Sequence, residues 1–247
     1  MKKTVMVVFS VAFIFSYCAP SRVSVSAAKP ESGASYVSYL ARGTSLLEQK
    51  KYDAAISELR QASILKPDSD KVYNFLGIAY FMKKNLDEAR KCFQKALAIN
   101  PAYAAAHCNL GNLQFKEGKV DSAVETLSQA IAAFDDNASL HFSLGTILLH
   151  KGEIDQGFAH LQKVMMLDPG YLDREKSFSI ETSESDLPQP EIFFCYARLY
   201  ASTANLKKTL QYLDKAKKAG FGEWKRIRHD DAFARLRDDP QVKKYLD

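Results

Sequence analysis

The sequence predicts an all-α protein built as a solenoid of stacked helical hairpins. Glycines recur at a strict spacing of 34 residues, at Gly43, Gly77, Gly111 and Gly145. Other residues repeat in the same register, and no segment reads convincingly as a strand. A repeated unit of this length buries its apolar face only against its neighbours, so the units are expected to stack into an elongated array.

Four units follow from this spacing, with each glycine at the eighth position; they cover residues 36–69, 70–103, 104–137 and 138–171. Position four is aromatic or histidine, position twenty is small and position twenty-four is large and apolar. These columns are Tyr39, Tyr73, His107 and His141, then Ala55, Ala89, Ala123 and Gly157, then Leu59, Phe93, Leu127 and Leu161. The small residues at positions eight and twenty are expected to face each other, so that two antiparallel helices approach closely.

The ends of the predicted helices also carry signals. An aspartate at position eighteen of each unit is expected to cap the second helix by binding its free N–H groups. Prolines near the unit ends cannot continue a helix interior, so they are expected to stop one helix and open the next. The aspartates are Asp53, Asp87, Asp121 and Asp155, and the prolines are Pro67, Pro101 and Pro169.

The repeated pattern resembles the tetratricopeptide repeat, a helix-turn-helix unit of 34 residues. The second unit, DKVYNFLGIAYFMKKNLDEARKCFQKALAINPAY, matches that family at nearly every position. The resemblance implies a right-handed α-solenoid that serves as a protein-interaction scaffold.

The register slips after the fourth unit. Residues 171–190 are rich in Ser, Glu, Asp and Pro without a helical period, which predicts an exposed loop. A degenerate fifth hairpin is predicted at residues 190–220. Residues 221–247 are expected to form a helical cap that shields the last apolar face, with Trp224 as part of the core.

The N-terminal residues predict export to the bacterial cell envelope. Lys2 and Lys3 precede an apolar run, Val5 to Phe15, that is shorter than the roughly 20 residues of a membrane-crossing helix. Two endings of this signal stay open.

In the first, FSYC resembles a bacterial lipobox, although Tyr17 departs from it. Residues 1–18 would then be the signal, Cys18 the site of lipid attachment and residues 19–34 a flexible tether. In the second, cleavage after Ala27 or Ala28 would give a soluble periplasmic or secreted protein.

No catalytic constellation stands out, which predicts a protein without enzymatic activity, metal or cofactor. His107 and His141 lie one repeat apart, about 10 Å by helix-packing spacing, which is too far to share a zinc ion. Cys92, Cys108 and Cys195 are expected to be buried free thiols, although a bridge between Cys92 and Cys108 is conceivable. The formal charge of +5 shows no basic cluster, which argues against a nucleic-acid partner.

An interaction surface remains as the functional candidate. In the tetratricopeptide family the first helix of each unit forms the concave wall, so the resemblance implies a partner-binding groove. Its residues would be Leu47, Asn74, Ile78, Phe81, Met82, Asn112, Phe115, Lys116, Phe142 and Leu149. A mainly apolar lining suits a peptide or an amphipathic helix of a protein partner.

Alternatives to this groove stay open. The residues at position twelve could pack against the neighbouring hairpin instead of lining a groove. The groove could also hold a glycan or a small molecule. The family's clamp for a terminal carboxylate is disfavoured, because only Asn109 matches it.

Overall fold

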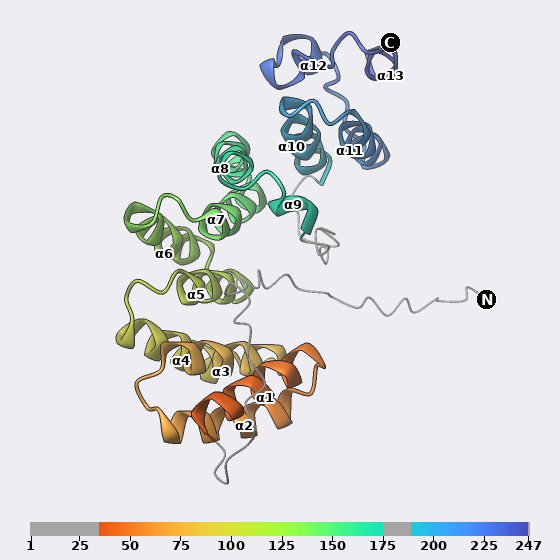
Figure 1. Cartoon of the computed structure of the whole chain (residues 1–247). Coiled ribbons are helices and arrows are strands. Elements are labelled where there is room, and N and C mark those ends of the chain that lie inside the picture. The colour runs from red at the N-terminus through yellow and green to blue at the C-terminus, as the bar shows by residue number, and fades with distance from the viewer. Residues whose placement is uncertain (1–34, 175–188, 247) are drawn as a thin grey trace, which may run out of the picture.

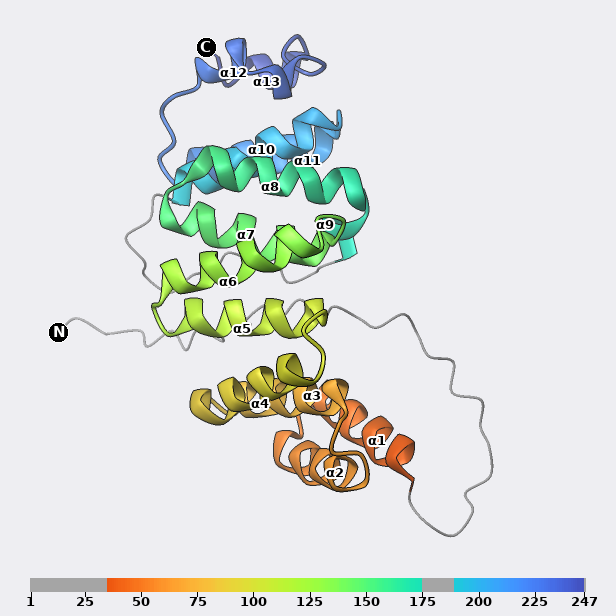
Figure 2. The same cartoon turned by 90° about the vertical axis from the view of Figure 1, so that its left-hand side faces the viewer.

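The computed structural model describes residues 35–174 and 189–246, and this part of the chain contains helices and turns but no strand. Helical hairpins are stacked one upon another, from α1 and α2 at one end to α12 and α13 at the other (Figures 1 and 2). The predicted all-α solenoid is therefore confirmed. Cys18 and the N-terminal signal lie outside the described residues.

Five hairpins form the array in the described residues; the short helix α9 lies between the fourth and the fifth, and further short helices follow the fifth. The hairpins are α1 (Tyr36–Glu48) with α2 (Tyr52–Leu65), α3 (Asp70–Met82) with α4 (Leu86–Ile99), α5 (Ala104–Lys116) with α6 (Val120–Ala133), α7 (Ala138–Lys151) with α8 (Ile154–Leu167), and α10 (Gln189–Ser202) with α11 (Leu206–Lys218). The short helices are α9 (Tyr171–Arg174), α12 (Arg226–His229), the 3-10 turn η1 (Asp231–Phe233) and α13 (Pro240–Lys243).

The repeated glycines at position eight allow the two helices of a hairpin to touch. They mainly face the large apolar residue at position twenty-four, whereas the small residue at position twenty was expected. A Cβ atom added at Gly77 would lie 2.6 Å from Cδ1 of Phe93, at position twenty-four. Gly43 and Gly111 meet Leu59 and Leu127 in the same way. Position eight comes within reach of position twenty in the fourth hairpin, where the added Cβ of Gly145 would lie 3.0 Å from the backbone oxygen of Gly157.

The turn inside every hairpin requires a left-handed residue at position fifteen. Gly118 and Gly152 supply it without steric cost, at φ values of 77° and 88°. Lys50, Lys84 and Ala204 adopt the same conformation with a side chain, at φ values of 59°, 62° and 57°. Because Ala204 falls at this position when the fifth unit begins at residue 190, the fifth hairpin keeps the turn geometry of the others.

The aspartates at position eighteen are not N-caps, contrary to expectation. The second helices begin at position seventeen, so Asp53 and its equivalents lie in the first turn, where a negative charge still favours the helix dipole. Asp53 also pairs with Lys83, and Asp121 pairs with Lys151 at 3.0 Å. These aspartates therefore join one hairpin to the next.

The beginning of the predicted loop at residues 171–190 is helical, because α9 occupies its first four positions. Leu172 is buried, the ring of Tyr171 packs on Phe142 at 5.2 Å, and the Tyr171 hydroxyl donates to Oγ of Ser139 at 3.1 Å. The polar composition of the segment hid this apolar pair. The loop prediction for residues 175–188 lies outside the described residues.

The C-terminal helices cover the fifth hairpin, as expected of a cap. Phe194 on α10 is fully buried, and its ring stacks on Phe221 at 4.2 Å and on Phe233 at 5.8 Å. Trp224 is half-buried and meets Phe221 edge-on at 4.9 Å, so it packs against the core as predicted.

Candidate binding surface

The predicted groove residues belong to the first helices of four hairpins, α1, α3, α5 and α7. Side chains cap three of these helices: Oγ of Ser35 and of Ser69 accept from backbone N–H groups of α1 and α3, and Oδ1 of Asn137 accepts from two in α7. Such caps stabilise a helix by about 1 kcal/mol each. The N-cap of α5, Tyr103, makes no side-chain cap, so packing holds α5 in place.

Six of the ten predicted groove residues are buried between the helices. Their exposed fractions run from 1% to 7%; they are Leu47, Asn74, Ile78, Phe81, Phe142 and Leu149. Three residues of position twelve are among them, which agrees with the alternative that this position packs against the neighbouring hairpin. A partner cannot touch these side chains unless the hairpins move apart.

The other four predicted residues remain accessible and lie on two helices that contact each other, α3 and α5. Met82 ends α3, and Asn112, Phe115 and Lys116 lie on α5, which contacts α3. The first three are half-buried and Lys116 is exposed. We call these four residues the central cluster.

Lys116 of the central cluster lies near enough to Lys84 for the two charges to repel each other. Partial burial lowers the pKa of the Lys116 ammonium group, and the charge of Lys84 lowers it further. Two ammonium groups that repel each other in this way gain when a carboxylate comes between them. The apolar surface of Met82 and Phe115 is next to these charges, so the cluster combines an apolar contact with an attraction for acids.

Phe115 extends the surface toward the fourth hairpin. Its ring meets that of His150 on α7 with centroids 5.4 Å apart. Burial lowers the pKa of His150, so this imidazole is neutral at neutral pH.

A buried amide pair lies behind this surface. Nδ2 of Asn109 on α5 donates to Oδ1 of Asn74 on α3 at 2.8 Å, and both side chains are at most 3% exposed. Oδ1 of Asn109 has no hydrogen-bond partner. Asn74 therefore fixes the spacing of two hairpins and does not act as a polar fixture in an open groove.

The histidines form a contact that the repeat pattern did not predict. Nδ1 of His141 on α7 lies 2.9 Å from Nδ1 of His160 on α8, and Nε2 of His141 lies 3.0 Å from the backbone oxygen of Asp135. Nε2 of His107 contacts the backbone oxygen of Pro101 at 2.9 Å, at the equivalent place one repeat earlier. Position four thus binds the end of the preceding repeat. The partner His160 lies outside the repeat columns, so only the three-dimensional structure reveals the pair.

Other kinds of site find no support among the described residues. Within residues 35–174 and 189–246, no three potential metal ligands from His, Cys, Asp and Glu converge. No disulfide joins the described cysteines, Cys92, Cys108 and Cys195. Burial raises the pKa of the Cys92 thiol to about 11 and that of Cys195 to about 12, which makes both poor nucleophiles. None of the helices in this part of the chain has the length and apolar character needed to cross a bilayer.

Comparisons with known proteins agree on the repeat. Models described as "TPR repeat" and "Tetratricopeptide repeat" match residues 77–118, 46–94 and 108–170. Together these matches run from residue 46 to residue 170. No curated protein matches the chain.

Solved structures share the fold. TTC0263, a thermophilic TPR protein in Thermus thermophilus, is 20% identical with a TM-score of 0.53, over 81% of this chain and 100% of that one. MamA 41-end from Desulfovibrio magneticus RS-1 is 16% identical with a TM-score of 0.50, over 81% of this chain and 98% of that one. At these identities the likeness shows the helical-hairpin fold.

Proposed function

Because this chain is a tetratricopeptide repeat protein, we propose that it is a non-enzymatic scaffold that binds a peptide or helix of a protein partner at its central cluster. Repeats of this family imply protein or peptide partners, and the family is typically non-catalytic. The observation that carries the proposal is the accessibility of Phe115. Among the four residues at position twelve, Phe115 is half-buried, whereas Leu47, Phe81 and Leu149 are buried.

The chemistry of the central cluster defines the partner that it would suit. A partner segment would place an apolar side chain against Met82 and Phe115, and the amide of Asn112 would bond to its backbone. An acidic residue of the same segment would approach Lys84 and Lys116, whose positive charges lie near each other.

Site-specific photo-crosslinking tests this proposal in intact cells. A photoreactive amino acid replaces Phe115 in one variant and Ile64 in another. Ile64 is an apolar residue on α2 that is 67% exposed and lies outside the cluster, so it serves as the matched control. We expect a discrete crosslinked protein from position 115, and its loss when Lys116→Glu is added. Crosslinks from position 64 with none from position 115 would place the binding surface elsewhere.

Isothermal titration separates the two classes of ligand that the sequence leaves open. Peptides taken from a crosslinked partner and fragments of wall glycan are titrated into the purified chain. The proposal expects heat from the peptide, reduced by Phe115→Glu. Glycan binding that is insensitive to that change would favour a ligand-binding protein instead.

We further propose that the scaffold is exported and held at a bacterial membrane by a lipid on Cys18. The support is the sequence alone, namely Lys2 and Lys3, the apolar run from Val5 to Phe15, and the FSYC motif. Mass spectrometry of the mature N-terminus tests this proposal. A diacylglyceryl cysteine is expected, and Cys18→Ser should release the protein from membranes. A mature chain that starts at Ala28 or Lys29 would instead make it a soluble exported protein.

A further inference from the structure

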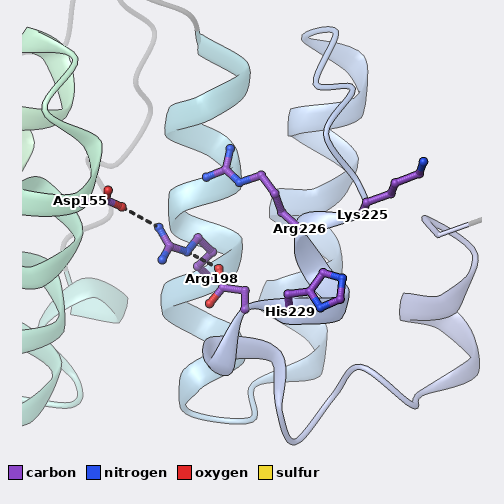
Figure 3. Close-up of a pocket in the computed structure, with 6 residues that line it drawn as sticks. Asp155, Arg198, Lys225, Arg226 and His229 are labelled. Atoms are coloured by element: carbon purple, nitrogen blue, oxygen red, sulfur yellow. Dashed lines mark ion pairs between the residues drawn. The ribbon is translucent and has the colours of Figure 1, made fainter.

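A cleft of about 390 Å³ lies where α8, α10 and the C-terminal cap meet, away from the central cluster. All its lining residues are acidic, basic or histidine: Asp155, Arg198, Lys225, Arg226, His229 and Asp230. Figure 3 shows Arg198 at its centre, between Asp155 of α8 and the cap. The fold needs no such concentration of ionisable groups on a surface that merely closes the array.

Arg198 is held rigidly but is incompletely bonded. Its side chain is 14% exposed, and its guanidinium lies over the ring of Phe158, with Cζ 4.0 Å from the centroid. Nε lies 2.5 Å from Oδ2 of Asp230, yet neither Nε nor Nη1 has a hydrogen-bond partner in favourable geometry. Because an unsatisfied buried donor is costly, an oxygen atom placed beside Nη1 would be stabilising.

Asp155 forms an ion pair with Nη1, but it is poorly placed to satisfy this donor. Its Oδ1 lies 3.7 Å from Nη1, beyond hydrogen-bond distance, and its side chain is 95% exposed. Exposed pairs of this kind are weak. The carboxylate of Asp155 can therefore turn into solvent and leave its place to another acid.

The remaining basic residues differ in how far they are engaged. Nη1 of Arg226 donates to Glu191 at 2.8 Å and to Glu223 at 3.2 Å, so Arg226 is already neutralised. Among the described residues, Lys225 and His229 have neither a hydrogen-bond partner nor an ion-pair partner. Lys225 supplies positive potential at the rim of the cleft, and the imidazole of His229 offers a hydrogen-bond donor there.

The charge of the lining indicates which anion fits. Because Glu191 and Glu223 already neutralise Arg226, Arg198 and Lys225 face the carboxylates of Asp155 and Asp230, and one positive charge is left when Asp155 turns into solvent. A carboxylate balances this charge. A phosphate monoester carries about −1.5 to −2 at neutral pH and would exceed it beside Asp230.

We propose that this cleft binds a carboxylate, which takes the place of Asp155 beside Nη1 of Arg198 while Lys225 attracts it and His229 donates to it from the rim. The site is independent of the central cluster, and its ligand is a small acid or an acidic side chain of a bound protein. It lies at the junction of the fourth hairpin, the fifth hairpin and the cap, so an occupied site also ties these three parts together.

Nuclear magnetic resonance titration of the full chain tests the site with three probes: N-acetyl-glutamate α-amide, its uncharged analogue N-acetyl-glutamine α-amide, and inorganic phosphate. We expect saturable shifts of the Arg198 Nε–H and His229 ring signals with the first probe. The glutamine analogue should leave them unchanged, and phosphate should bind more weakly. A response to the uncharged analogue, or tighter binding of phosphate, would overturn the assignment to a carboxylate.

Three substitutions at exposed positions test whether the affinity for the glutamate probe changes in the direction that the site predicts. Asp155→Asn removes the competing anion and should tighten binding of the glutamate probe roughly two- to fivefold, whereas Lys225→Gln should weaken it by a similar factor. Lys244→Gln, the same change on the same cap but outside the cleft, should leave the affinity unchanged. Equal affinities in all three variants would place the bound probe outside the cleft, and the absence of saturable binding would mean that water alone fills it; either result would overturn the proposal.

Discussion

Gly77 shows at the scale of one residue why the repeat keeps its glycine. An added Cβ would lie 2.6 Å from Cδ1 of Phe93, and the Phe93 ring is fully buried and cannot swing away. Alanine gains about 1 kcal/mol of helix propensity, but overpacking costs about 1–3 kcal/mol. We therefore expect Gly77→Ala to destabilise the chain by up to about 2 kcal/mol in urea unfolding. Gly222→Ala, where no atom lies within 4 Å, is the control and should have little effect.

His160 makes stability depend on pH. Burial lowers its pKa below the usual 6.5, and the neighbouring His141 lowers it further, whereas Asp135 acts in the opposite direction. Asp135 is itself engaged by Lys163. Below about pH 6.5 the unfolded chain binds the proton more readily than the folded one, so stability should be complete above that pH and fall as the pH drops.

Urea midpoints between pH 7.5 and pH 5 measure this dependence. The loss of stability on acidification should be smaller in His160→Gln than in the unmodified chain. His229→Gln, at an exposed histidine, should keep the full loss. Identical losses in the three proteins would show that the imidazole pair does not govern the acid response.

At the scale of elements, the buried amide pair between α3 and α5 predicts an asymmetric mutant cycle. Asn74→Leu leaves the Nδ2 group of Asn109 without its acceptor and should cost about 1–3 kcal/mol. Asn109→Leu also removes an oxygen that has no partner, so it should cost less. The double substitution to Leu should recover most of the loss, as measured by urea unfolding. Additive losses would mean that the two amides act independently.

The helices could be predicted from the sequence wherever a residue type has a single local role. The glycine period places the hairpins because a Cβ at Gly77 has no room, and Pro101 follows the end of α4 as a helix breaker would. The aspartate caps were wrong, because capping depends on a shift of two positions that periodicity does not fix. The helix at Tyr171 escaped notice because a polar composition outweighed two apolar residues.

The binding residues were harder to predict than the elements for a physical reason. Positions twelve and five lie at the boundary between the buried face and the exposed face of the first helix. Phe81 and Phe115 share position twelve, yet Phe81 is buried and Phe115 is half-buried, so the position in the repeat does not by itself decide exposure. The cleft around Arg198 unites residues from three elements that share no repeat register, so no column of the repeat signals it.

At the scale of the whole molecule, buried apolar residues form three adjoining clusters that follow each other along the array. A structure of this kind transmits stability mainly between neighbours. The two ends differ, because the cap covers the fifth hairpin whereas Val37, Ile64 and Leu65 of the first hairpin are 53% to 67% exposed. Because stability passes mainly between neighbours, a destabilising substitution at the capped end should affect mainly the hairpin next to it.

Phe233→Ala tests this locality without shortening the chain. The Phe233 ring is fully buried against Phe194, so its removal should cost about 3–5 kcal/mol, as is usual for a core phenylalanine. In a quasi-one-dimensional array, this loss falls on the cap and on α10 and α11, whose apolar faces the cap shields. Hydrogen exchange should consequently speed up strongly in α10 and α11 but very little in α1 to α4. Equal acceleration in every hairpin would show that the five hairpins unfold as a single cooperative unit.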